Sequence, residues 1–439
     1  MGLEVGRRWG LRSILIGCAL ILGAGKVAAQ SPPMPTPVPT PLAETATQAK
    51  LPEPRPEIFP LAIPYYVLKG VTYPVSKLAH VIEKNKYSRR SVGLVINKDR
   101  NFSVYPILTV GDGRKFGGGL GISAINLFHQ PYVLKTDFIL YQDLDQRASF
   151  SISNDAAFRV FDRNFSFEFL STWYKDGDED FFGIGPDTSE SNKSEFGLQR
   201  FVIGTRFGFE LIHNLSLSPR IFFDTALSNN GHADFPDSVE ANFPPSELAG
   251  FGRTISYLDF GFRLAHDDRD PDINPRHGGL RELTFHRFMG VGQKGFDYFQ
   301  WDVDVEQYFQ LWHPRLVLWL HNGWTFQKES GGSQIPFYRL AELDVNSPLR
   351  GFDKGRFRDR GSVVFNVEFR YPIWDNVDGT VFFDTGRVFD GISNFAFKDF
   401  KLTGGGGLRV TVNEFYLFKL EVATGGEGVN VIFRAVQNL

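Results

Sequence analysis

The chain has 439 residues, among them 44 Phe, 14 Tyr, 7 Trp and 45 Gly, with a mean hydropathy of −0.18 and a formal net charge of −3. This slightly acidic balance offers no basic surface, so we expect no nucleic-acid partner. The only cysteine is Cys18, near the N-terminus, which excludes disulfides, thiolate metal sites and cysteine nucleophiles from the rest of the chain.

The first 29 residues have the pattern of an export signal. Arg7, Arg8 and Arg12 precede an apolar run from Ser13 to Gly25, and small residues after the run offer a cleavage site. The run is shorter than the roughly 20 residues that span a bilayer comfortably. We therefore predict a Sec-type signal peptide over 1–29. Its removal takes away four basic residues and one acidic residue, which changes the net charge from −3 to −6.

Two short segments are expected next. Residues 30–60 are rich in proline, which indicates an extended linker. Within residues 61–90, apolar side chains recur at helical spacing, at Val71, Val75, Leu78, Val81 and Ile82. This spacing predicts a short amphipathic periplasmic segment that lies on a membrane surface, or in the mouth or on the rim of the domain that follows.

From residue 101 onward, apolar and polar residues alternate with a period of two, as in β-strands. In residues 296–310, Asp302, Asp304 and Glu306 share one face, while Val303 and Val305 share the other. A face with three acidic residues lines a polar lumen rather than a dry core. No long apolar run follows residue 29, so a membrane-spanning form must be a closed barrel. We predict an all-β, antiparallel transmembrane β-barrel of the outer membrane over residues 91–439.

The pattern predicts about sixteen strands, an even number as in bacterial single-chain barrels. We expect them near 101–110, 114–127, 132–144, 147–161, 163–175, 195–211, 215–228, 252–268, 278–291, 296–310, 314–327, 361–372, 379–390, 400–412, 415–424 and 428–436. The long connections, near 176–194, 229–251, 328–360 and 391–399, all follow odd-numbered strands. Because such barrels keep short turns in the periplasm and long loops outside, both chain ends are expected in the periplasm.

The longest late loop, after the eleventh predicted strand, contains the sequence Arg350-Gly351-Phe352. Two strands follow it, and alternation places Glu368 and Asp384 on their polar faces. A guanidinium offers five donors in a rigid fork, which suits a clamp between two carboxylates. Glycine allows the loop to turn or to approach the wall closely.

These three segments together resemble the barrel domain of the BamA/TamA surface-antigen superfamily, which includes two-partner-secretion transporters. The resemblance implies that the loop folds into the lumen and that Arg350 meets Glu368 and Asp384, with Phe352 wedged beside the pair. A second segment resembles the family's turn between two late-middle strands, with matches at Asp267, Arg269, Asp270, Pro275 and Gly278. The resemblance covers roughly residues 90–439.

The resemblance implies a role in protein insertion into the outer membrane or translocation across it. Residues 30–90 are too short for the periplasmic modules with which assembly factors of the family recruit clients, so a periplasmic partner would supply them. The alternatives are a stand-alone pore or structural barrel and, more remotely, an outer-membrane lipid hydrolase. Further expected partners are outer-membrane lipid, lipopolysaccharide and the barrel-assembly machinery.

No enzyme, cofactor or metal site is predicted. The glycine runs at 117–121 and 404–407 lie in strand pattern, whereas phosphate loops precede a helix. The acidic run at 176–180 lacks the glycine of a calcium loop, because Phe181 stands at that position. The nine histidines show no metal-ligand spacing, and no motif organises a catalytic triad.

Overall fold

The computed structural model describes residues 69–70, 72–74, 76–77, 95–96, 101–111, 114–127, 130–160, 163–232, 237–270, 274–344, 349–412 and 415–435. The predicted signal peptide and linker lie outside these residues. So do all five apolar positions of the predicted amphipathic segment, although the described residues between 69 and 77 are helical. Within the described part of the chain, no helix combines the length and the apolar character needed to cross a membrane.

Sixteen long strands form the fold, and every one overlaps a predicted strand, so the prediction of about sixteen is confirmed. They are β2 (Phe102–Gly111), β3 (Arg114–Leu127), β4 (Tyr132–Tyr141), β5 (Gln146–Val160), β6 (Arg163–Phe181), β7 (Ser194–Ile212), β8 (Leu215–Asn229), β9 (Thr254–Asp267), β10 (Gly278–Val291), β11 (Tyr298–Gln310), β12 (Val317–Glu329), β15 (Gly361–Trp374), β16 (Val377–Phe389), β17 (Lys401–Val412), β18 (Phe415–Thr424) and β19 (Val429–Ala435).

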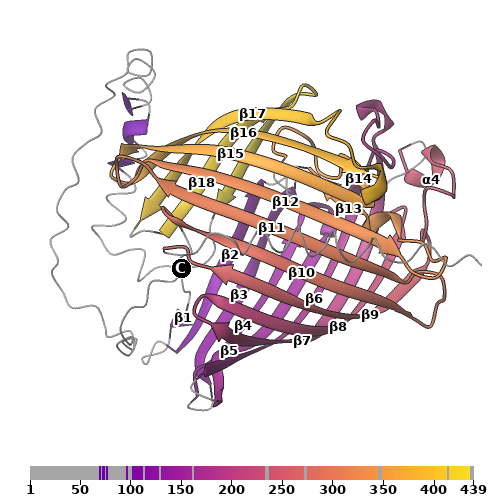
Figure 1. The fold of residues 1–439 in the computed structure, drawn as a ribbon, viewed down its shortest axis with the longest axis horizontal. Helices are drawn as coiled ribbons and strands as arrows, with labels where there is room; N and C mark the ends of the chain where they lie inside the picture. The colour runs from indigo at the N-terminus through magenta and orange to yellow at the C-terminus, as the bar shows by residue number, and fades with distance from the viewer. Residues whose placement is uncertain are drawn as a thin grey trace, which may run out of the picture. The chain divides into compact units, whose positions relative to one another are not determined.

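Each long strand pairs antiparallel with the next one along the chain in a strongly curved sheet (Figure 1), and β19 at its end is a neighbour of β2. Paired residues are described for every two consecutive long strands, from β2 and β3 to β18 and β19. Among the described residues, no register of paired residues joins β19 to β2. The edge of β2 is instead paired at two residues with the short strand β1 (Val95–Ile96).

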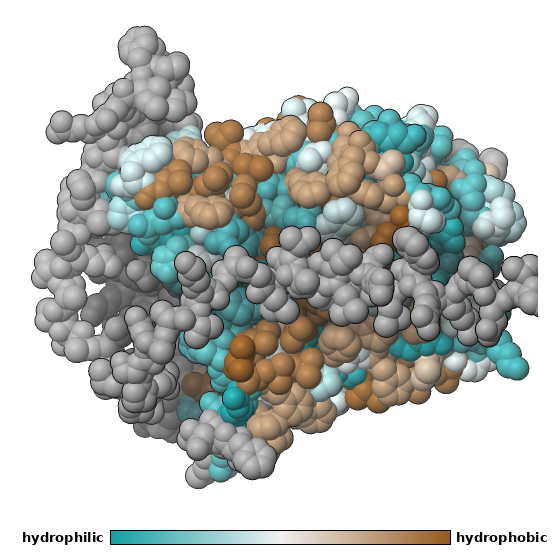
Figure 2. Space-filling view, in the orientation of Figure 1, coloured by the Kyte–Doolittle hydropathy of each residue, from teal (hydrophilic) through white to brown (hydrophobic). Residues whose placement is uncertain are grey.

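The strands turn polar side chains inward and apolar ones outward. On β16, Val381 and Phe383 are 55% and 47% exposed, whereas Phe382 and Asp384 between and beside them are buried. A soluble protein of this architecture would show the opposite arrangement. Figure 2 shows hydrophobic residues gathered over the outer faces of the strands. This distribution fits a sheet surrounded by lipid and closed around a polar lumen.

The two ends of the sheet differ in their connections. At one end, which we call the long-loop end, the connections include 182–193, 230–253, 330–360 and 390–400. At the other, the short-turn end, most connections have two to six residues, such as 213–214 and 375–376. The exception is 268–277, which lies within the predicted turn motif.

The longest connection, 330–360, folds into the lumen and carries the short hairpin of β13 (Ala341–Leu343) and β14 (Phe357–Asp359). Its apolar residues occupy two buried clusters. Phe337 packs against Phe181 and Phe196 near the short helix α4 (Val239–Asn242). Leu349 and Phe352 belong to a second cluster with residues of β13 to β16. The predicted in-folded loop after the eleventh strand is thereby confirmed.

The helical residues before the barrel contact the turn between β15 and β16. The Trp374 indole Nε1 donates to Lys69 O at 3.2 Å and to Thr72 Oγ1 at 3.1 Å. Asn376 Nδ2 donates to Ser76 O at 2.9 Å. These bonds hold the described helical residues against the rim at the short-turn end.

Candidate functional site

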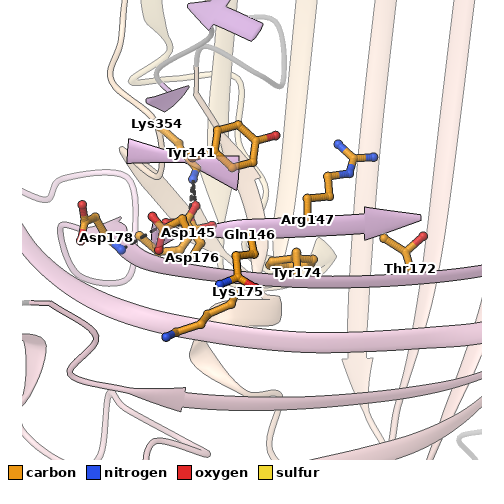
Figure 3. Close-up of a pocket in the computed structure, with 11 residues that line it drawn as sticks. Tyr141, Asp145, Gln146, Arg147, Thr172, Tyr174, Lys175, Asp176, Asp178 and Lys354 are labelled. Carbon is orange, nitrogen blue, oxygen red and sulfur yellow. Dashed lines mark hydrogen bonds and ion pairs between the residues drawn. The ribbon is translucent and has the colours of Figure 1, made fainter. Parts of the chain in front are cut away.

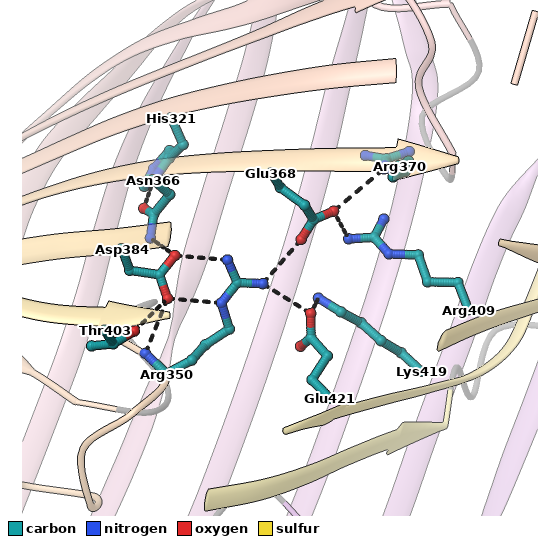
Figure 4. Close-up of polar contacts among 10 residues, drawn as sticks. All are labelled: His321, Arg350, Asn366, Glu368, Arg370, Asp384, Thr403, Arg409, Lys419 and Glu421. Carbon is teal, nitrogen blue, oxygen red and sulfur yellow. Dashed lines mark hydrogen bonds and ion pairs between the residues drawn. The ribbon is translucent and has the colours of Figure 1, made fainter. Parts of the chain in front are cut away.

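The candidate site is a cluster of charged side chains around Arg350, which reaches the lumen wall from the in-folded loop (Figure 4). Its carboxylates come from inward positions on β15, β16 and β18. Alternation along β15 and β16 turns Glu368 and Asp384 inward, and both are fully buried. Glu421 on β18 is fully buried as well, and it lies inward by the same alternation.

Arg350 uses its whole guanidinium fork. Its Nε and Nη2 donate to the two oxygens of Asp384 at 2.9 and 2.7 Å. Its Nη1 donates to Glu368 Oε2 at 2.9 Å and to Glu421 Oε1 at 2.8 Å. The structure therefore brings together the three residues that the resemblance implies, and it adds Glu421. We call these four residues the lumen lock. Planar bidentate pairing of this kind suits arginine and not lysine.

The aromatic ring beside the lock is not the expected one. The ring of Phe382 lies 3.4 Å from the Arg350 guanidinium carbon, in a cation–π contact. Gly405 makes room for it, because a Cβ there would lie 2.5 Å from the Phe382 ring. Phe352 instead packs edge-on against Phe357 at a centroid distance of 5.0 Å. The expectation that Phe352 wedges beside the ion pair is therefore corrected: the apolar cluster between loop and wall takes its ring.

Gly351 allows the loop backbone to lie close to the barrel wall. A Cβ on this residue would lie 2.5 Å from the carbonyl carbon of Thr424 and from the amide nitrogen of Gly425. Both positions are at the end of β18, where any side chain larger than hydrogen would push the loop away.

Further cations surround the buried carboxylates. Arg409 pairs closely with Glu368 Oε1, Arg370 Nε lies 3.4 Å from the same oxygen, and Lys419 Nζ lies 2.8 Å from Glu421 Oε1. Burial by itself would lower the pKa of the Arg350 guanidinium, but hydrogen bonds and the nearby carboxylate charges raise it above its usual value. Arg350 therefore stays charged, and the cluster as a whole is close to charge balance.

A hydrogen-bonded relay holds Asp384 from its other side. Asn366 Nδ2 donates to Asp384 Oδ1 at 2.7 Å, and His321 Nδ1 lies 2.6 Å from Asn366 Oδ1. His321 Nε2 lies 2.8 Å from Asp304 Oδ2. Thr403 on β17 also donates to Asp384, at 3.1 Å. These bonds orient the carboxylate toward Arg350.

The predicted turn motif forms a compact network of its own at the short-turn end. Asp267 accepts two hydrogen bonds from Arg269, at 2.9 and 2.7 Å. Asp270 Oδ1 accepts from the backbone amides of Arg276 and His277 at 2.7 and 3.2 Å. Gly278 has a φ of 85°, which favours glycine.

The turn motif and the lumen lock are connected, which sequence reasoning missed. Arg370 Nη1 donates to Asn274 Oδ1 at 2.7 Å and to Pro275 O at 3.1 Å. The same guanidinium contacts Glu368 of the lock. The turn is thus folded inward, and it reaches the lock through one buried arginine.

The in-folded loop is also fastened to the opposite wall. Arg339 donates to both oxygens of Asp224 on β8, at 2.9 and 2.7 Å, and Arg200 shares that carboxylate. The Arg339 guanidinium also lies over the rings of Tyr257 and Phe288. The loop therefore crosses the lumen between two buried anchors.

A third contact lies at the long-loop rim, beside a pocket of about 280 Å³ (Figure 3). Lys354 Nζ lies 3.3 Å from Asp176 and 2.8 Å from Glu179, so these acidic residues bind a cation of the loop itself. Asp145, Asp178 and His232 nearby have potential metal-ligand atoms within 4.8 Å of one another. His232 is paired with Asp178 at 2.9 Å, and Asp145 accepts from the Gly177 amide at 2.8 Å.

Several site residues carried a partial signal in the sequence. Alternation turns Glu421, Arg409 and Arg370 inward on their strands, as it does Glu368. Nothing local marks which inward residues meet, because Arg350 and Glu421 are 71 positions apart.

Comparisons with known proteins agree with this architecture. The family model of the Omp85 superfamily domain matches residues 111–428. Among solved structures, BamA from Haemophilus ducreyi lacking POTRA domains 1–3 is similar at 15% identity and a TM-score of 0.57, over 80% of this chain and 76% of that one. CdiB from Acinetobacter baumannii matches at 14% identity (TM-score 0.47, 76% of this chain, 59% of that chain). CdiB from Escherichia coli matches at 11% identity (TM-score 0.48, 76% and 61%).

No curated protein sequence matches the chain. The likeness to BamA concerns the fold, and it supports the predicted barrel. The family model covers well over half of the sequence, from the end of β2 to the turn before β19, and it includes both motifs and every member of the lumen lock. Membership indicates a bacterial outer-membrane location, as the sequence predicted. The chain belongs to the Omp85 superfamily.

Proposed function

We propose that this protein takes part in inserting proteins into the bacterial outer membrane or in moving them across it. A periplasmic partner would supply the client-recruiting modules. The protein performs this work by changing strand pairing and loop position, without catalysing a chemical reaction. In this assignment the short-turn end faces the periplasm and the long-loop end faces outward.

The observation that carries the proposal is a β2–β19 junction for which the described residues show no register of paired residues, together with a loop that binds the hairpin bordering it. Among the described residues, the β2–β19 junction is the one between neighbouring long strands without a register of pairs. The in-folded loop binds the hairpin β18–β19, which borders this junction. Arg350 binds Glu421, Asn430 Nδ2 donates to Arg350 O at 3.4 Å, and Arg356 donates to Glu427 at 2.6 and 2.7 Å.

Strand physics connects this arrangement to the function. An unpaired strand edge presents free amide and carbonyl groups, which bind an extended segment of another chain by β-augmentation. A hairpin that is fastened from inside keeps that edge closed at rest. Release of the loop would free the hairpin, and the edge would then accept a client strand.

A disulfide tether across the junction tests this proposal. The mature chain would contain no cysteine, so Val431→Cys on β19 can be paired with Pro106→Cys on β2, which lies beyond the two residues of β2 that pair with β1, in the full-length protein. A matched control pairs Leu283→Cys with Val303→Cys, which are already register partners on β10 and β11. The readout is the protein content of the outer membrane and of the culture medium, under oxidising and reducing conditions.

We expect the junction tether to deplete specific proteins from one of these fractions, with recovery on reduction, whereas the control tether has no effect. Deletion of the protein should deplete the same set. If neither deletion nor tethering changes either fraction, the proposal is wrong. A steady conductance in planar bilayers that persists in the tethered protein would then identify the alternative, a stand-alone pore.

A further inference from the structure

We propose that Arg370 is a positioning residue that couples the turn 267–278 to the lumen lock, so that displacement of the turn loosens the in-folded loop. The coupling concerns the barrel itself, and it goes beyond the proposed function because it holds whether or not proteins pass through the barrel. Through this coupling, a displacement of the turn at the short-turn end would loosen the in-folded loop, which starts and ends at the opposite end of the barrel.

The contacts form one uninterrupted path. Asn274 Oδ1 and Pro275 O accept from Arg370 Nη1 at 2.7 and 3.1 Å. Arg370 Nε donates to Glu368 Oε1 at 3.4 Å. Glu368 Oε2 accepts from Arg350 at 2.9 Å. The turn at Asn274 and the loop residue Arg350 are far apart in the sequence, but only the side chains of Arg370 and Glu368 lie between them.

Because its residues are buried, this path is sensitive to the loss of a single hydrogen-bond partner. Arg370 is 4% exposed and Glu368 is fully buried, so neither can exchange a lost partner freely for bulk water. If the turn withdraws its two acceptors, the Arg370 guanidinium has to satisfy its donors elsewhere. Glu368 is the carboxylate already in contact with it, and Arg409 competes for the same oxygen. A shift of Glu368 toward Arg370 weakens its bond to Arg350.

Hydrogen bonds organise the described residues of the turn, 267–270 and 274–278. Asp267 binds Arg269, Asp270 accepts from the amides of 276 and 277, and Asp268 accepts from the Gly279 amide and from Arg281 of β10. The contact of the turn with the lock runs through the Asn274 side chain and one carbonyl, so a small displacement breaks both bonds. Coupling between distant sites requires an element of this kind, whose position both sites influence.

The experiment measures trypsin cleavage of the loop at Lys354, Arg356 and Arg358 in the purified full chain in detergent. Asn274→Ala removes one acceptor at the turn without touching the loop. We expect loop cleavage to become about tenfold faster, as the loss of a charge-assisted hydrogen bond implies. Asn274→Asp retains the acceptor oxygen, and its cleavage rate should stay near that of the wild type.

A matched control is Asn376→Ala. This asparagine is a turn residue at the same end whose side chain binds Ser76, and none of its contacts with the described residues leads to the lock. It should leave the loop protected. Equal acceleration by both alanine variants would mean general loosening and would overturn the proposal.

A double variant completes the test. In an Arg350→Ala background the lock is already open, so adding Asn274→Ala should accelerate cleavage no further. If the two substitutions multiply as independent effects, or if Asn274→Ala alone leaves the rate unchanged, Arg370 does not couple the turn to the loop.

Discussion

The in-folded loop meets the barrel wall through two cations only four positions apart, Arg350 and Lys354, in very different surroundings. The Arg350 side chain is 5% exposed, and all three of its carboxylate partners are completely buried. Lys354 pairs at the rim with Asp176 and Glu179, which are 26% and 13% exposed beside an open pocket. The N–O distances of the two sets of ion pairs are similar, from 2.7 to 3.3 Å, but access of water differs.

That difference predicts unequal energies. A buried charge that loses its partner stays in a medium that cannot solvate it, whereas a rim charge regains water. The lumen lock should therefore dominate the stability of the loop, and the rim contact should adjust it only slightly. The following predictions test this ranking, from the largest effect to the smallest.

Arg350→Ala should have the largest effect. It leaves Glu368, Asp384 and Glu421 without their shared cation, which costs about 3–5 kcal/mol for a buried pair. We expect a lower unfolding temperature in heat-modifiability gels and protease access to residues 349–360. Arg350→Lys should recover little, because an ammonium cannot form the bidentate fork. Unchanged unfolding and unchanged protection in Arg350→Ala would refute the lock.

Arg339→Ala tests the anchor on the opposite wall. Its loss should cost about 3 kcal/mol, at the lower end for buried pairs, because Arg200 continues to neutralise Asp224. Denaturant unfolding of the purified barrel measures the difference. Asp224→Asn should cost more than Arg339→Ala, since it deprives two arginines of their carboxylate. The reverse order would show that the pairing of Arg200 with Asp224 does not contribute to stability.

Glu421→Gln tests the carboxylate that sequence reasoning missed. The substitution keeps the shape but removes the charge that Arg350 and Lys419 share, so we expect a loss of about 2 kcal/mol. The same assay applies, with Glu329→Gln, whose partner Arg360 is more exposed, as the control. If Glu421→Gln is neutral, Asp384 and Glu368 are sufficient to hold the loop.

Lys354→Ala should change the free energy of unfolding by about 1 kcal/mol or less, and this change should shrink in high salt. Unfolding at low and high ionic strength measures it. A loss of stability as large as that of Arg350→Ala would contradict the ranking, because it would show that partial exposure does not weaken the rim contact.

A separate prediction concerns the pH dependence of the hairpin of β13 and β14. Burial raises the pKa of Asp359 in β14 to about 6, and burial also raises the pKa of Glu342 in β13 in spite of the charge of Arg358. An unfolded aspartate titrates near pH 3.9, so between about pH 4 and 6 the folded hairpin binds a proton that the unfolded one lacks. Stability of the hairpin should therefore rise as pH falls through this window.

Hydrogen exchange of residues 341–344 and 349–359, corrected for the intrinsic rate, should be slower at pH 5 than at pH 7. Asp359→Asn should reduce the difference. Faster corrected exchange at pH 5 would contradict the assignment.

The sequence by itself determined the number of long strands, most of their limits to within two residues and the face that each residue presents. These properties are local, because an alternation of period two identifies a strand and assigns its residues to lumen or lipid. The strand β10 (Gly278–Val291) was predicted with its observed limits for this reason. Arg350, Glu368 and Asp384 were found through a family resemblance, since three separated segments had to be recognised together.

Only the tertiary structure decided which inward side chains meet. Glu421 reaches Arg350, Phe382 covers the guanidinium in place of Phe352, and Arg370 joins the turn at Asn274 to the lock. Each contact depends on the stagger between strands and on the path of a loop across the lumen. Alternation specifies the side on which a residue lies but not its height or its neighbour across the barrel, because those follow from closure of the whole sheet.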